Sequence, residues 1–328
     1  MALPSGYSVN VGVDVGGTKV NIVILDSETD LLLDQNKFII SETSDNLVGS
    51  IAKIVTSLTT GHKINFMGIG LPGMVNKDNT MTFSPHIEIL NGHNLASELS
   101  ESFRCLIRVE NDANCALIGE RLAGIAKDSD NVLMVTLGTG IGGAMITDGH
   151  FLLGHEGYIG EIGHMTVIKD GSKCICGKSG CWEIYAASSS LTIYYELFKN
   201  FPELMETTLT DREYKLFDTL NTDDLKIRNS EAVMENFKSG ETIATAALHT
   251  MMNWVAVGLS SLSAIMAPEI VVIGGGIVTE YELYKDILND YFKQYSSHSS
   301  YLPLVVPAKL GANAGAIGAA LLCKSTDR

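Results

Sequence analysis

The apolar positions of the chain fall into short runs separated by glycine turns and by segments of helical spacing, a pattern typical of an α/β protein. At the start, apolar runs cover residues 7–15 and 20–25 and flank a glycine turn at 16–19, and a third run covers 31–40. Short apolar runs bounded by glycine predict strands, so we expect three strands here, the first two joined by a tight turn. Apolar residues three and four positions apart over 46–59 then predict a helix.

The same alternation continues to the end of the chain. We expect further strands at 66–71, 105–109, 132–137, 144–147 and 270–273, and helices at 113–122, 241–266 and 311–322. Because residues 132–147 repeat the strand, glycine turn and strand of the start, the pattern indicates a duplicated core. We therefore predict a first lobe of residues 1–120, completed by a C-terminal helix at 311–328, and a second lobe of residues 121–310. The charged, largely helical stretch 191–237 is expected to be a solvated face.

Composition and charge narrow the class of protein. With 328 residues, 45% of them hydrophobic and 19% charged, the chain can build two apolar cores. Its formal net charge of −15 would repel phosphate backbones and anionic lipids, so we expect neither nucleic acid nor a membrane as a partner. We find no secretory signal and no apolar stretch long enough for a membrane span, so a soluble, cytoplasmic protein is expected.

Three glycine clusters each follow an apolar run: Gly16-Gly17, the segment 138–143 and the segment 274–276. Glycine at the end of a strand lets backbone amides approach a phosphate without a side chain in the way. Asp14 precedes the first cluster, where its carboxylate would hold Mg²⁺ directly or through water. No Gly-Lys-Ser or Gly-Lys-Thr follows any cluster, so none is a P-loop. One cluster alone is equally typical of a hairpin turn, but three together favour a nucleotide-binding protein.

These motifs resemble those of a known superfamily. The segments 14–19, 137–143 and 274–276 resemble the two phosphate motifs and the adenosine motif of the sugar kinase, hsp70 and actin superfamily. Further motifs resemble the signatures of the ROK family (repressors, open reading frames, kinases). They are Glu110-Asn111-Asp112-Ala113-Asn114 and Gly160-Glu161-Ile162-Gly163-His164, and the second is followed by Cys174-x-Cys176-Gly177-x-x-Gly180-Cys181-Trp182-Glu183.

The resemblance implies a two-lobed, actin-like ATPase fold of ribonuclease H-like type, with a duplicated βββαβα-type core and a cleft between the lobes. It also implies phosphorylation of a hexose or an N-acetylhexosamine by ATP with Mg²⁺, and we expect a homodimer. The implied ATP-binding residues are Asp14, Gly16, Gly17, Thr18, Lys19, Gly138, Thr139, Gly140, Gly142, Gly143, Gly274, Gly275 and Gly276.

Transfer of a phosphoryl group to a hydroxyl needs an acceptor for the hydroxyl proton. Asp112 is the candidate because it follows a predicted strand and opens a predicted helix, and by the resemblance it is the catalytic base. From spacing alone, a role as the N-cap of that helix is the alternative. The residues implied to bind the sugar are Gly73, Asn111, Asp112, Glu161, His164 and Glu183.

Three of the six cysteines lie close together in the sequence, which favours metal ligation over a disulfide framework. With His164, the cysteines Cys174, Cys176 and Cys181 supply an imidazole and three thiolates, a closed tetrahedral set suited to structural Zn²⁺. The metal would fix the loop 164–183 at the wall of the sugar pocket. Three reduced cysteines in a glycine loop are the alternative.

The loop at 84–90 departs from the glucokinase pattern. Many ROK glucokinases have Pro-Asn and then Trp where this chain has His86 and Leu90, a change that would suit another hexose or an acetamido group. We expect transfer to the 6-hydroxyl of glucose first, with N-acetylmannosamine, allose and fructose as alternative acceptors, and polyphosphate stays open as a donor. A DNA-binding repressor is disfavoured because few residues precede the first predicted strand. A non-enzymatic sugar sensor is disfavoured because Asp112 and the glycine turns are intact.

Overall fold

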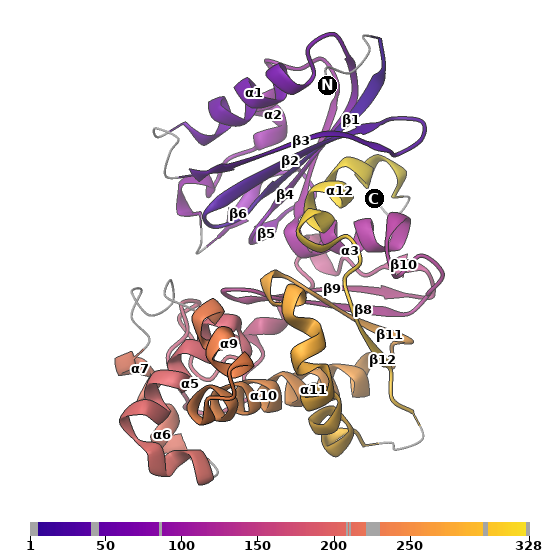
Figure 1. Ribbon diagram of the computed structural model, residues 1–328. Helices are drawn as coiled ribbons and strands as arrows, with labels where there is room; N and C mark the ends of the chain where they lie inside the picture. The colour runs from indigo at the N-terminus through magenta and orange to yellow at the C-terminus, as the bar shows by residue number, and fades with distance from the viewer. Residues whose placement is uncertain are drawn as a thin grey trace. The chain divides into compact units, whose positions relative to one another are not determined.

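The computed structural model describes residues 6–40, 46–84, 87–207, 209, 211–220, 230–297 and 301–325, and the chain forms two compact units (Figure 1). The first unit contains the residues up to Asp130, the segment Ala144–Gly160 and the residues from Ala308 onwards. The second unit contains Asn131–Gly143 and Glu161–Pro307. This grouping puts Ala144–Gly160 with the first unit, which the sequence pattern did not indicate.

A five-stranded sheet with the order β3-β2-β1-β4-β7 forms the centre of the first unit. Its strands are β1 (Ser8–Val15), β2 (Lys19–Asp26), β3 (Leu32–Ile39), β4 (Lys63–Leu71) and β7 (Leu106–Asn111). β1 and β2 are antiparallel, which confirms the predicted pair of strands around the first glycine turn, and β3 is antiparallel to β2. β4 runs parallel to both β1 and β7. A short hairpin of β5 (Met74–Val75) and β6 (Met81–Phe83) follows β4.

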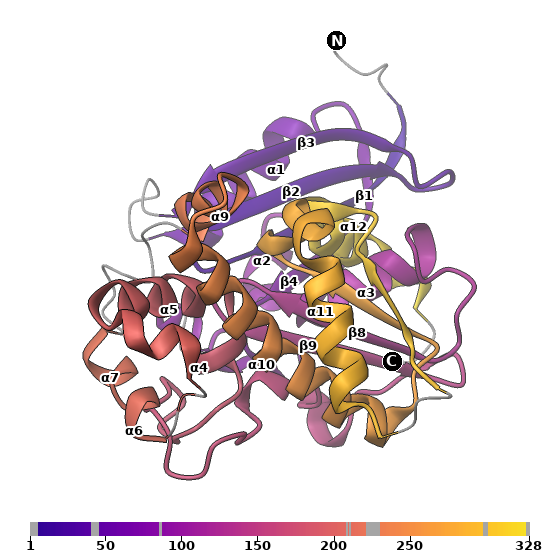
Figure 2. The ribbon, with the colours of Figure 1, turned by 60° about the horizontal axis from the view of Figure 1, so that its bottom comes forward.

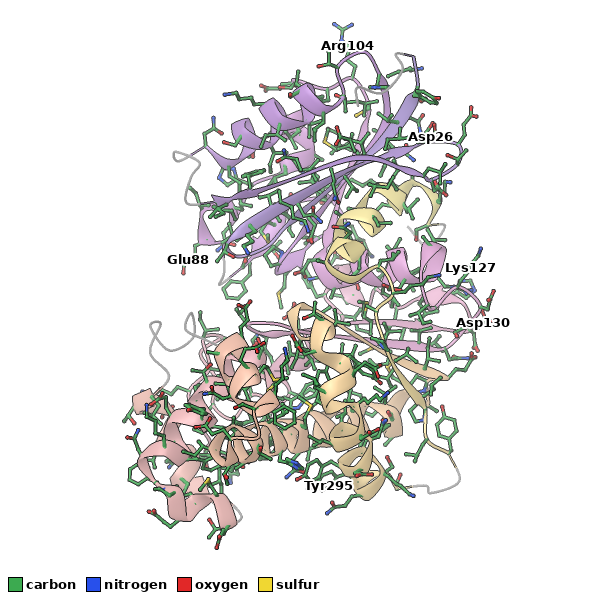
Figure 3. The ribbon with its side chains drawn as sticks, viewed as in Figure 1. Asp26, Glu88, Arg104, Lys127, Asp130 and Tyr295 are labelled. Atoms are coloured by element: carbon green, nitrogen blue, oxygen red, sulfur yellow. The ribbon has the colours of Figure 1, made fainter. Side chains whose placement is uncertain are left out.

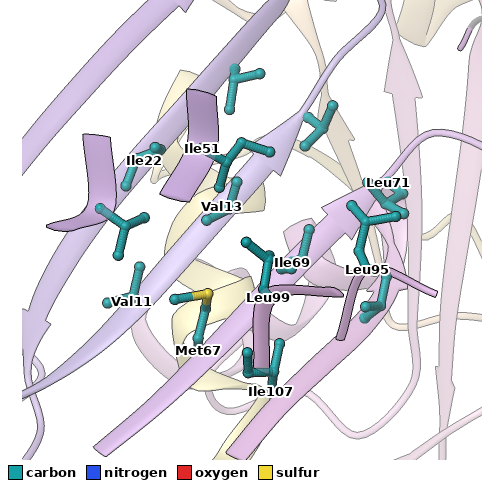
Figure 4. Packing of buried hydrophobic residues seen from close by; sticks show 14 of the residues in the cluster. Val11, Val13, Ile22, Ile51, Met67, Ile69, Leu71, Leu95, Leu99 and Ile107 are labelled. Carbon is teal, nitrogen blue, oxygen red and sulfur yellow. The ribbon is translucent and has the colours of Figure 1, made fainter. Parts of the chain in front are cut away.

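One face of this sheet packs against α1 (Leu47–Leu58) and α2 (Leu95–Ser100). Because successive side chains of a strand point to opposite faces, the alternate valines of β1 share this side of the sheet. Figure 4 shows Val11 and Val13 in this core together with Ile51 of α1, and each of these side chains is fully buried. The valine-rich run at the start of the chain is therefore explained by one apolar layer.

The opposite face of the sheet carries glycines, and α3 (Asp112–Ala123) and α12 (Ala314–Leu321) pack closely against it (Figures 1 and 2). A Cβ at Gly12 would lie 1.8 Å from a backbone oxygen of α12, and a Cβ at Gly68 would lie equally close to another. A Cβ at Gly318 would lie 1.6 Å from a backbone oxygen of α3. Backbone therefore packs directly against backbone, which only glycine permits at these positions.

A second five-stranded sheet has the order β10-β9-β8-β11-β12. Its strands are β8 (Val132–Leu137), β9 (Ile141–Thr147), β10 (His150–Phe151), β11 (Ile270–Gly274) and β12 (Leu304–Pro307). β10 is antiparallel to β9, and β11 is parallel to both β8 and β12. The order matches that of the first sheet strand for strand in chain order, which confirms the duplicated core.

The long helix α10 (Thr242–Met266) packs against α5 (Ser188–Asn200), α9 (Ser230–Lys238) and α11 (Tyr281–Tyr295) in the second unit. The shorter helices are α4 (Glu183–Ala186), α6 (Asp211–Tyr214) and α7 (Phe217–Leu220). Single 3₁₀ turns are η2 (Glu88–Leu90), η3 (His155–Gly157), η4 (Ile162–His164), η5 (Pro202–Glu206), η6 (Gly276–Glu280), η7 (Gly311–Asn313) and η8 (Leu322–Lys324). Among the described residues, no helix is both long and apolar enough to cross a membrane.

Candidate active site

The polar site residues of the first unit gather where its parallel strands end. β1, β4 and β7 run in the same direction, so their carboxyl ends meet at one edge of the sheet. Asp14 of β1 is in register with Gly70 of β4, and a Cβ at Gly70 would lie 3.5 Å from the Cα of Asp112. Gly73 follows β4, and Asn111 ends β7. The fold thus brings together Asp14, Gly73, Asn111 and Asp112, which are distant in the sequence.

Asp14 lies on the face of the sheet that carries α12. A Cβ at Gly315 would lie 2.7 Å from the Asp14 carboxyl carbon, so α12 presents bare backbone to this carboxyl group. Burial raises the pKa of Asp14 to about 6, and the positive charge of Lys37 opposes this rise. A cation bound beside Asp14 would favour its ionised form in the same way that Lys37 does.

Asn111, rather than Asp112, is the N-cap of α3. The Asn111 side-chain oxygen accepts hydrogen bonds from the backbone N–H groups of Ala113 at 2.9 Å and Asn114 at 3.2 Å. Its amide nitrogen donates to the backbone oxygen of Gly73 at 3.1 Å. The capping role that spacing allowed for Asp112 is therefore wrong, because the preceding residue satisfies the orphan N–H groups of the helix. Asp112 is the first residue of α3 and is partly exposed.

The first glycine turn is tight and open to solvent. The backbone N–H of Gly16 donates to the backbone oxygen of Lys19 at 2.8 Å, which closes the turn between β1 and β2. Gly17, Thr18 and Lys19 are exposed. The turn therefore presents backbone and the side chains of Thr18 and Lys19 at its surface.

The two glycine turns of the second unit lie against each other at the ends of β8 and β11. Gly275 has a φ of 83°, and a Cβ on it would lie 2.3 Å from the backbone oxygen of Leu137. Both the conformation and the close approach require glycine here. Gly138, which follows Leu137, donates its N–H to the backbone oxygen of Gly140 at 3.0 Å. Thr139 at the tip of this turn is exposed.

Two serines at the start of α5 hold the turn after β8. The N–H and hydroxyl of Ser188 both donate to the backbone oxygen of Gly138, at 2.8 and 2.5 Å. The hydroxyl of Ser189 donates to the backbone oxygen of Thr139 at 3.1 Å. Neither serine was predicted from the sequence, because a run of small residues carries no signal until the fold places it beside the turn.

A cavity of about 410 Å³ opens beside these turns, between α5, α9 and the segment after β11. Its volume is in the range of small-ligand sites. Lys238 lies near this cavity and pairs with Glu235 at 2.8 Å and Glu280 at 3.2 Å. The lining residues are Ser188, Leu191, Ser230, Glu231, Met234, Glu235, Gly276, Ile277, Thr279 and Glu280. Most of them come from α9 and η6; Gly276 belongs to the third glycine cluster, whereas the residues of α9 gave no functional signal in the sequence.

Four side chains of the cysteine motif converge in the second unit. The ligand atoms of His164, Cys174, Cys176 and Cys181 all lie within 4.8 Å of one another. The Cys174 sulfur lies 3.6 Å from His164 Nδ1, and the Cys176 and Cys181 sulfurs are 3.6 Å apart. Gly177 turns the loop with a φ of 87°. Three sulfurs and one imidazole nitrogen form a closed set compatible with a metal ion.

The thiols of this cluster differ in acidity. Burial raises the pKa of Cys174, and it raises the pKa of Cys181 to about 11. Burial acts in the same direction on Cys176, but the backbone N–H of Lys178 and the neighbouring thiols outweigh it and lower the pKa of Cys176. Three thiolates at neutral pH therefore need a compensating positive charge within the cluster, which a divalent metal would supply.

Two carboxylates flank His164. The Glu161 carboxylate lies 3.8 Å from His164 Nε2, and the Glu183 carboxylate lies 3.4 Å from His164 Nδ1 and 3.1 Å from the Cys174 sulfur. The Nδ1 atom thus faces the cysteines while Nε2 faces Glu161. One nitrogen of the imidazole is placed to hold a metal, and the other is placed beside a carboxylate.

The end of the cysteine loop is anchored on α10 by Trp182. This side chain is fully buried, and its ring nitrogen donates to the backbone oxygen of Trp254 at 2.7 Å. A Cβ at Gly258 would lie 2.0 Å from the Trp182 ring, so the indole rests directly on the helix backbone. Because Cys181 and Glu183 flank Trp182, this packing fixes both of them.

The predicted sugar-binding residues fall into two groups, Asn111, Asp112 and Gly73 in the first unit and Glu161, His164 and Glu183 in the second. Of the two positions at which the chain departs from the glucokinase pattern, His86 lies outside the described residues. Leu90 is only 2% exposed and belongs to the core of the first unit. The departure at Leu90 is therefore a matter of packing rather than of direct contact with a sugar.

Comparison with known proteins agrees with these features. The model of the ROK family matches residues 10–326. The sequence is 32% identical to the glucokinase of Streptomyces coelicolor over 323 residues, covering 97% of this chain and 98% of the relative. The crystal structure of a ROK family glucokinase from Streptomyces griseus in complex with glucose and AMPPNP has a TM-score of 0.80 at 30% identity, covering 96% of this chain and 99% of that one. The xylose repressor of Bacillus subtilis is 29% identical over 96% of this chain and 76% of its own length.

The chain therefore belongs to the ROK family. Its α/β architecture is the actin-like ATPase fold of the ROK sugar kinases.

Proposed function

We propose that this protein is an ATP-dependent hexose kinase that transfers the γ-phosphoryl group to the 6-hydroxyl of glucose. The observation that carries the proposal is the placement of Asp112 at the start of α3, beside Asp14 and Gly73 at the carboxyl edge of the first sheet. The similarity to glucokinases over almost the whole chain supports both the reaction and the sugar. N-acetylmannosamine, allose and fructose remain the alternative acceptors.

Asp112 is the proposed catalytic base. Asn111 is the N-cap of α3, so Asp112 occupies the first turn, where it is partly exposed and its carboxylate accepts a hydrogen bond from the backbone N–H of Ala113 at 2.8 Å. The loose transition state of phosphoryl transfer depends on positioning and charge neutralisation more than on early removal of the proton. A carboxylate of modest basicity held at the acceptor hydroxyl is sufficient for this role.

The glycine turns are proposed to bind the phosphates of ATP through their backbone N–H groups. The cavity beside Gly276 and Ser188 is proposed to hold the nucleoside, since its volume suits a base and a ribose. Asp14 fits a role as the carboxylate that holds Mg²⁺, because nothing larger than backbone faces it from α12. Mg²⁺ would supply the positive charge that neutralises the phosphates.

The acceptor sugar is proposed to be held by side chains from both groups of predicted residues. Carboxylates of Glu161 and Glu183 accept hydrogen bonds from sugar hydroxyls, and the amide of Asn111 has one N–H left after its bond to Gly73. His164 Nε2 points toward Glu161, where it can contact the same hydroxyls.

The metal of the cysteine cluster is proposed to be a structural Zn²⁺. The donor set of three thiols and one imidazole fits zinc, and it leaves no position for a catalytic water. Its role would be to fix His164 and Glu183, which the loop presents from the second unit.

The proposal is tested by measuring ADP release with MgATP and each of glucose, N-acetylmannosamine, N-acetylglucosamine, mannose, allose and fructose. We expect glucose to give the highest kcat/KM, with transfer at the 6-hydroxyl established from the phosphorylated product. Turnover of another sugar at higher kcat/KM would replace glucose, and the absence of turnover with every sugar would refute the kinase assignment. Sugar binding without ADP release would then favour a regulator that only senses sugar, a role suggested by the likeness to the xylose repressor.

A further inference from the structure

We propose that Ser84 is a positioning residue, and that with Asn91 it forms a clasp holding Gly73, beside the start of α3, in the conformation that binds the acceptor sugar. This inference rests on the proposed function, because it assigns the clasp to the sugar site of the kinase. The clasp lies entirely within the first unit.

Ser84 is fully buried, and its hydroxyl and backbone groups are all hydrogen-bonded to described residues. Its hydroxyl donates to the backbone oxygen of Pro72 at 2.5 Å and accepts from the backbone N–H of Ile87 at 3.2 Å. The Asn91 side chain makes two hydrogen bonds to the backbone of Ser84. Its oxygen accepts from the Ser84 N–H at 2.7 Å, and its nitrogen donates to the Ser84 backbone oxygen at 3.4 Å. The Ser84 side chain therefore joins the segment after β4 to Ile87, and the Asn91 side chain joins Ser84 to the end of η2.

The clasp acts directly on Gly73. This residue has a φ of 132°, and a Cβ on it would lie 2.4 Å from the backbone oxygen of Phe83 and 2.9 Å from the Cβ of Ser84. The bond from Ser84 to Pro72 holds the chain at this close approach. The position of Gly73 is thus set by Ser84, and glycine is needed because no other residue fits.

Gly73 in turn contacts the start of α3. Its backbone oxygen accepts the hydrogen bond from the Asn111 amide, and the same Asn111 side chain caps the helix that begins with Asp112. A continuous series of hydrogen bonds and contacts therefore runs from Ser84 through Gly73 and Asn111 to the proposed base.

Ser84 itself cannot contact the sugar, because it has no exposed surface. Removing its hydroxyl should therefore reduce the fraction of molecules in the conformation that binds sugar. It should not remove a contact to any one sugar. Apparent affinity falls in proportion to that fraction, whichever sugar binds, while the bound complex turns over normally. This distinguishes the clasp from a residue that touches the sugar, whose loss would affect different sugars to different degrees.

The test compares Ser84→Ala with Thr82→Ala in the full-length protein. Thr82 is the matched control because its exposed hydroxyl also donates to a backbone oxygen, that of Met74, at 3.0 Å across the same hairpin. For Ser84→Ala we expect the KM of every accepted sugar to rise by the same factor, at most about tenfold for the loss of one buried hydrogen bond. We expect kcat and the KM for ATP to stay within about twofold, and Thr82→Ala to match the wild type throughout.

An unchanged sugar KM in folded Ser84→Ala protein, or a rise that differs strongly between sugars, would overturn the clasp. If Ser84→Ala does not fold, Asn91→Ala is measured in the same way, because it opens the clasp from its exposed partner. An unchanged sugar KM in that variant would also overturn the clasp. Failure of the proposed function is seen separately, as absence of turnover in the wild type with all sugars tested.

Discussion

Glu120 is a fully buried carboxylate on α3 that holds two separate segments of the first unit. One of its oxygens accepts from the backbone N–H of Ile125 at 2.8 Å, and the other accepts from the backbone N–H of Leu310 at 2.8 Å. Ile125 belongs to the segment that leads from α3 toward β8, and Leu310 belongs to the segment between β12 and α12. Gly124 leaves room for the carboxylate, since a Cβ there would lie 1.9 Å from its oxygen.

Glutamine in place of Glu120 keeps one acceptor and turns the other bond into a contact between two donors. The loss of one hydrogen bond to a charged acceptor costs about 1.5–3 kcal/mol, and the buried N–H left without a partner costs about 1–3 kcal/mol. We therefore expect Glu120→Gln to lower the free energy of unfolding by about 3 kcal/mol, and Glu120→Ala, which leaves two N–H groups and a cavity, to lower it by about 5 kcal/mol.

The first measurement is urea unfolding followed by circular dichroism, with Glu101→Gln as the control because Glu101 is an exposed residue of the same unit. Hydrogen exchange adds a local measurement: peptides covering 112–130 and 308–325 should lose protection in Glu120→Gln. Tryptophan fluorescence reports the other unit, since both tryptophans, Trp182 and Trp254, belong to the second unit. It shows whether that unit unfolds in a separate transition.

A loss below about 1 kcal/mol in Glu120→Gln, with unchanged exchange in both peptides, would refute this reasoning. It would mean that other contacts, such as those of Arg121, are sufficient to hold the segment after α3. That residue donates to the backbone oxygen of Ala126 at 3.4 Å and to Asp130 at 3.0 Å. Figure 3 shows Lys127 and Asp130 on the surface of this segment, in contrast to the buried Glu120.

Four further predictions concern single residues. Asp112→Asn should reduce turnover by roughly a hundredfold or more while calorimetry shows unchanged sugar binding; near-normal turnover would remove Asp112 from the mechanism. Cys174→Ser should lower the zinc content below the one ion per chain that elemental analysis is expected to find, and a wild type without zinc would contradict the cluster's assignment. Gly318→Ala should cost about 3 kcal/mol of stability, because the new Cβ would lie 1.6 Å from a backbone oxygen of α3; an unchanged melting temperature would contradict the close packing. The pKa of Asp14 is raised to about 6 in the folded state, so the fold binds a proton more readily than the unfolded chain, and the wild type should lose stability as pH rises from about 4 to 6. In Mg²⁺-free buffer at pH 8, Asp14→Asn should therefore be more stable than the wild type by at most about 3 kcal/mol, and equal stability would argue against a buried charge.

Most of the longer strands and the helices α1, α3 and α10 were predictable because burial imposes a period on them, whereas α11 and β12 were not predicted. The valines of β1 alternate with Asn10, Gly12 and Asp14, and this period of two separates the core face from the face that meets α12. The same register puts Asp14 on the face of the glycines. The duplicated core was visible as a repeated glycine turn, and the equal strand order of the two sheets confirms it.

The sequence indicated the clustering of the cysteine motif, because ligand spacing is a local property of a loop. It did not indicate Ser188, Ser189 or the cavity walls on α9. These residues act through tertiary placement: Ser188 matters because its helix starts beside the backbone oxygen of Gly138, which lies 50 positions earlier. No pattern within α5 itself encodes that neighbour.

In residues 87–91 the sequence does not reveal which apolar side chains are buried. In the 3₁₀ turn η2, Ile89 is 58% exposed while the adjacent Leu90 is 2% exposed, so neighbouring apolar residues have opposite roles. A single turn is too short for any period to reveal which residue faces the core. The path of the backbone decides which of the two side chains is buried, and the hydrogen bonds of Ser84 and Asn91 stabilise that path. We therefore expect the buried clasp to set the affinity for all sugars alike and the choice between sugars to depend on side chains that contact them, and we expect substitutions at Leu90 to act only by disturbing the core in which it is buried.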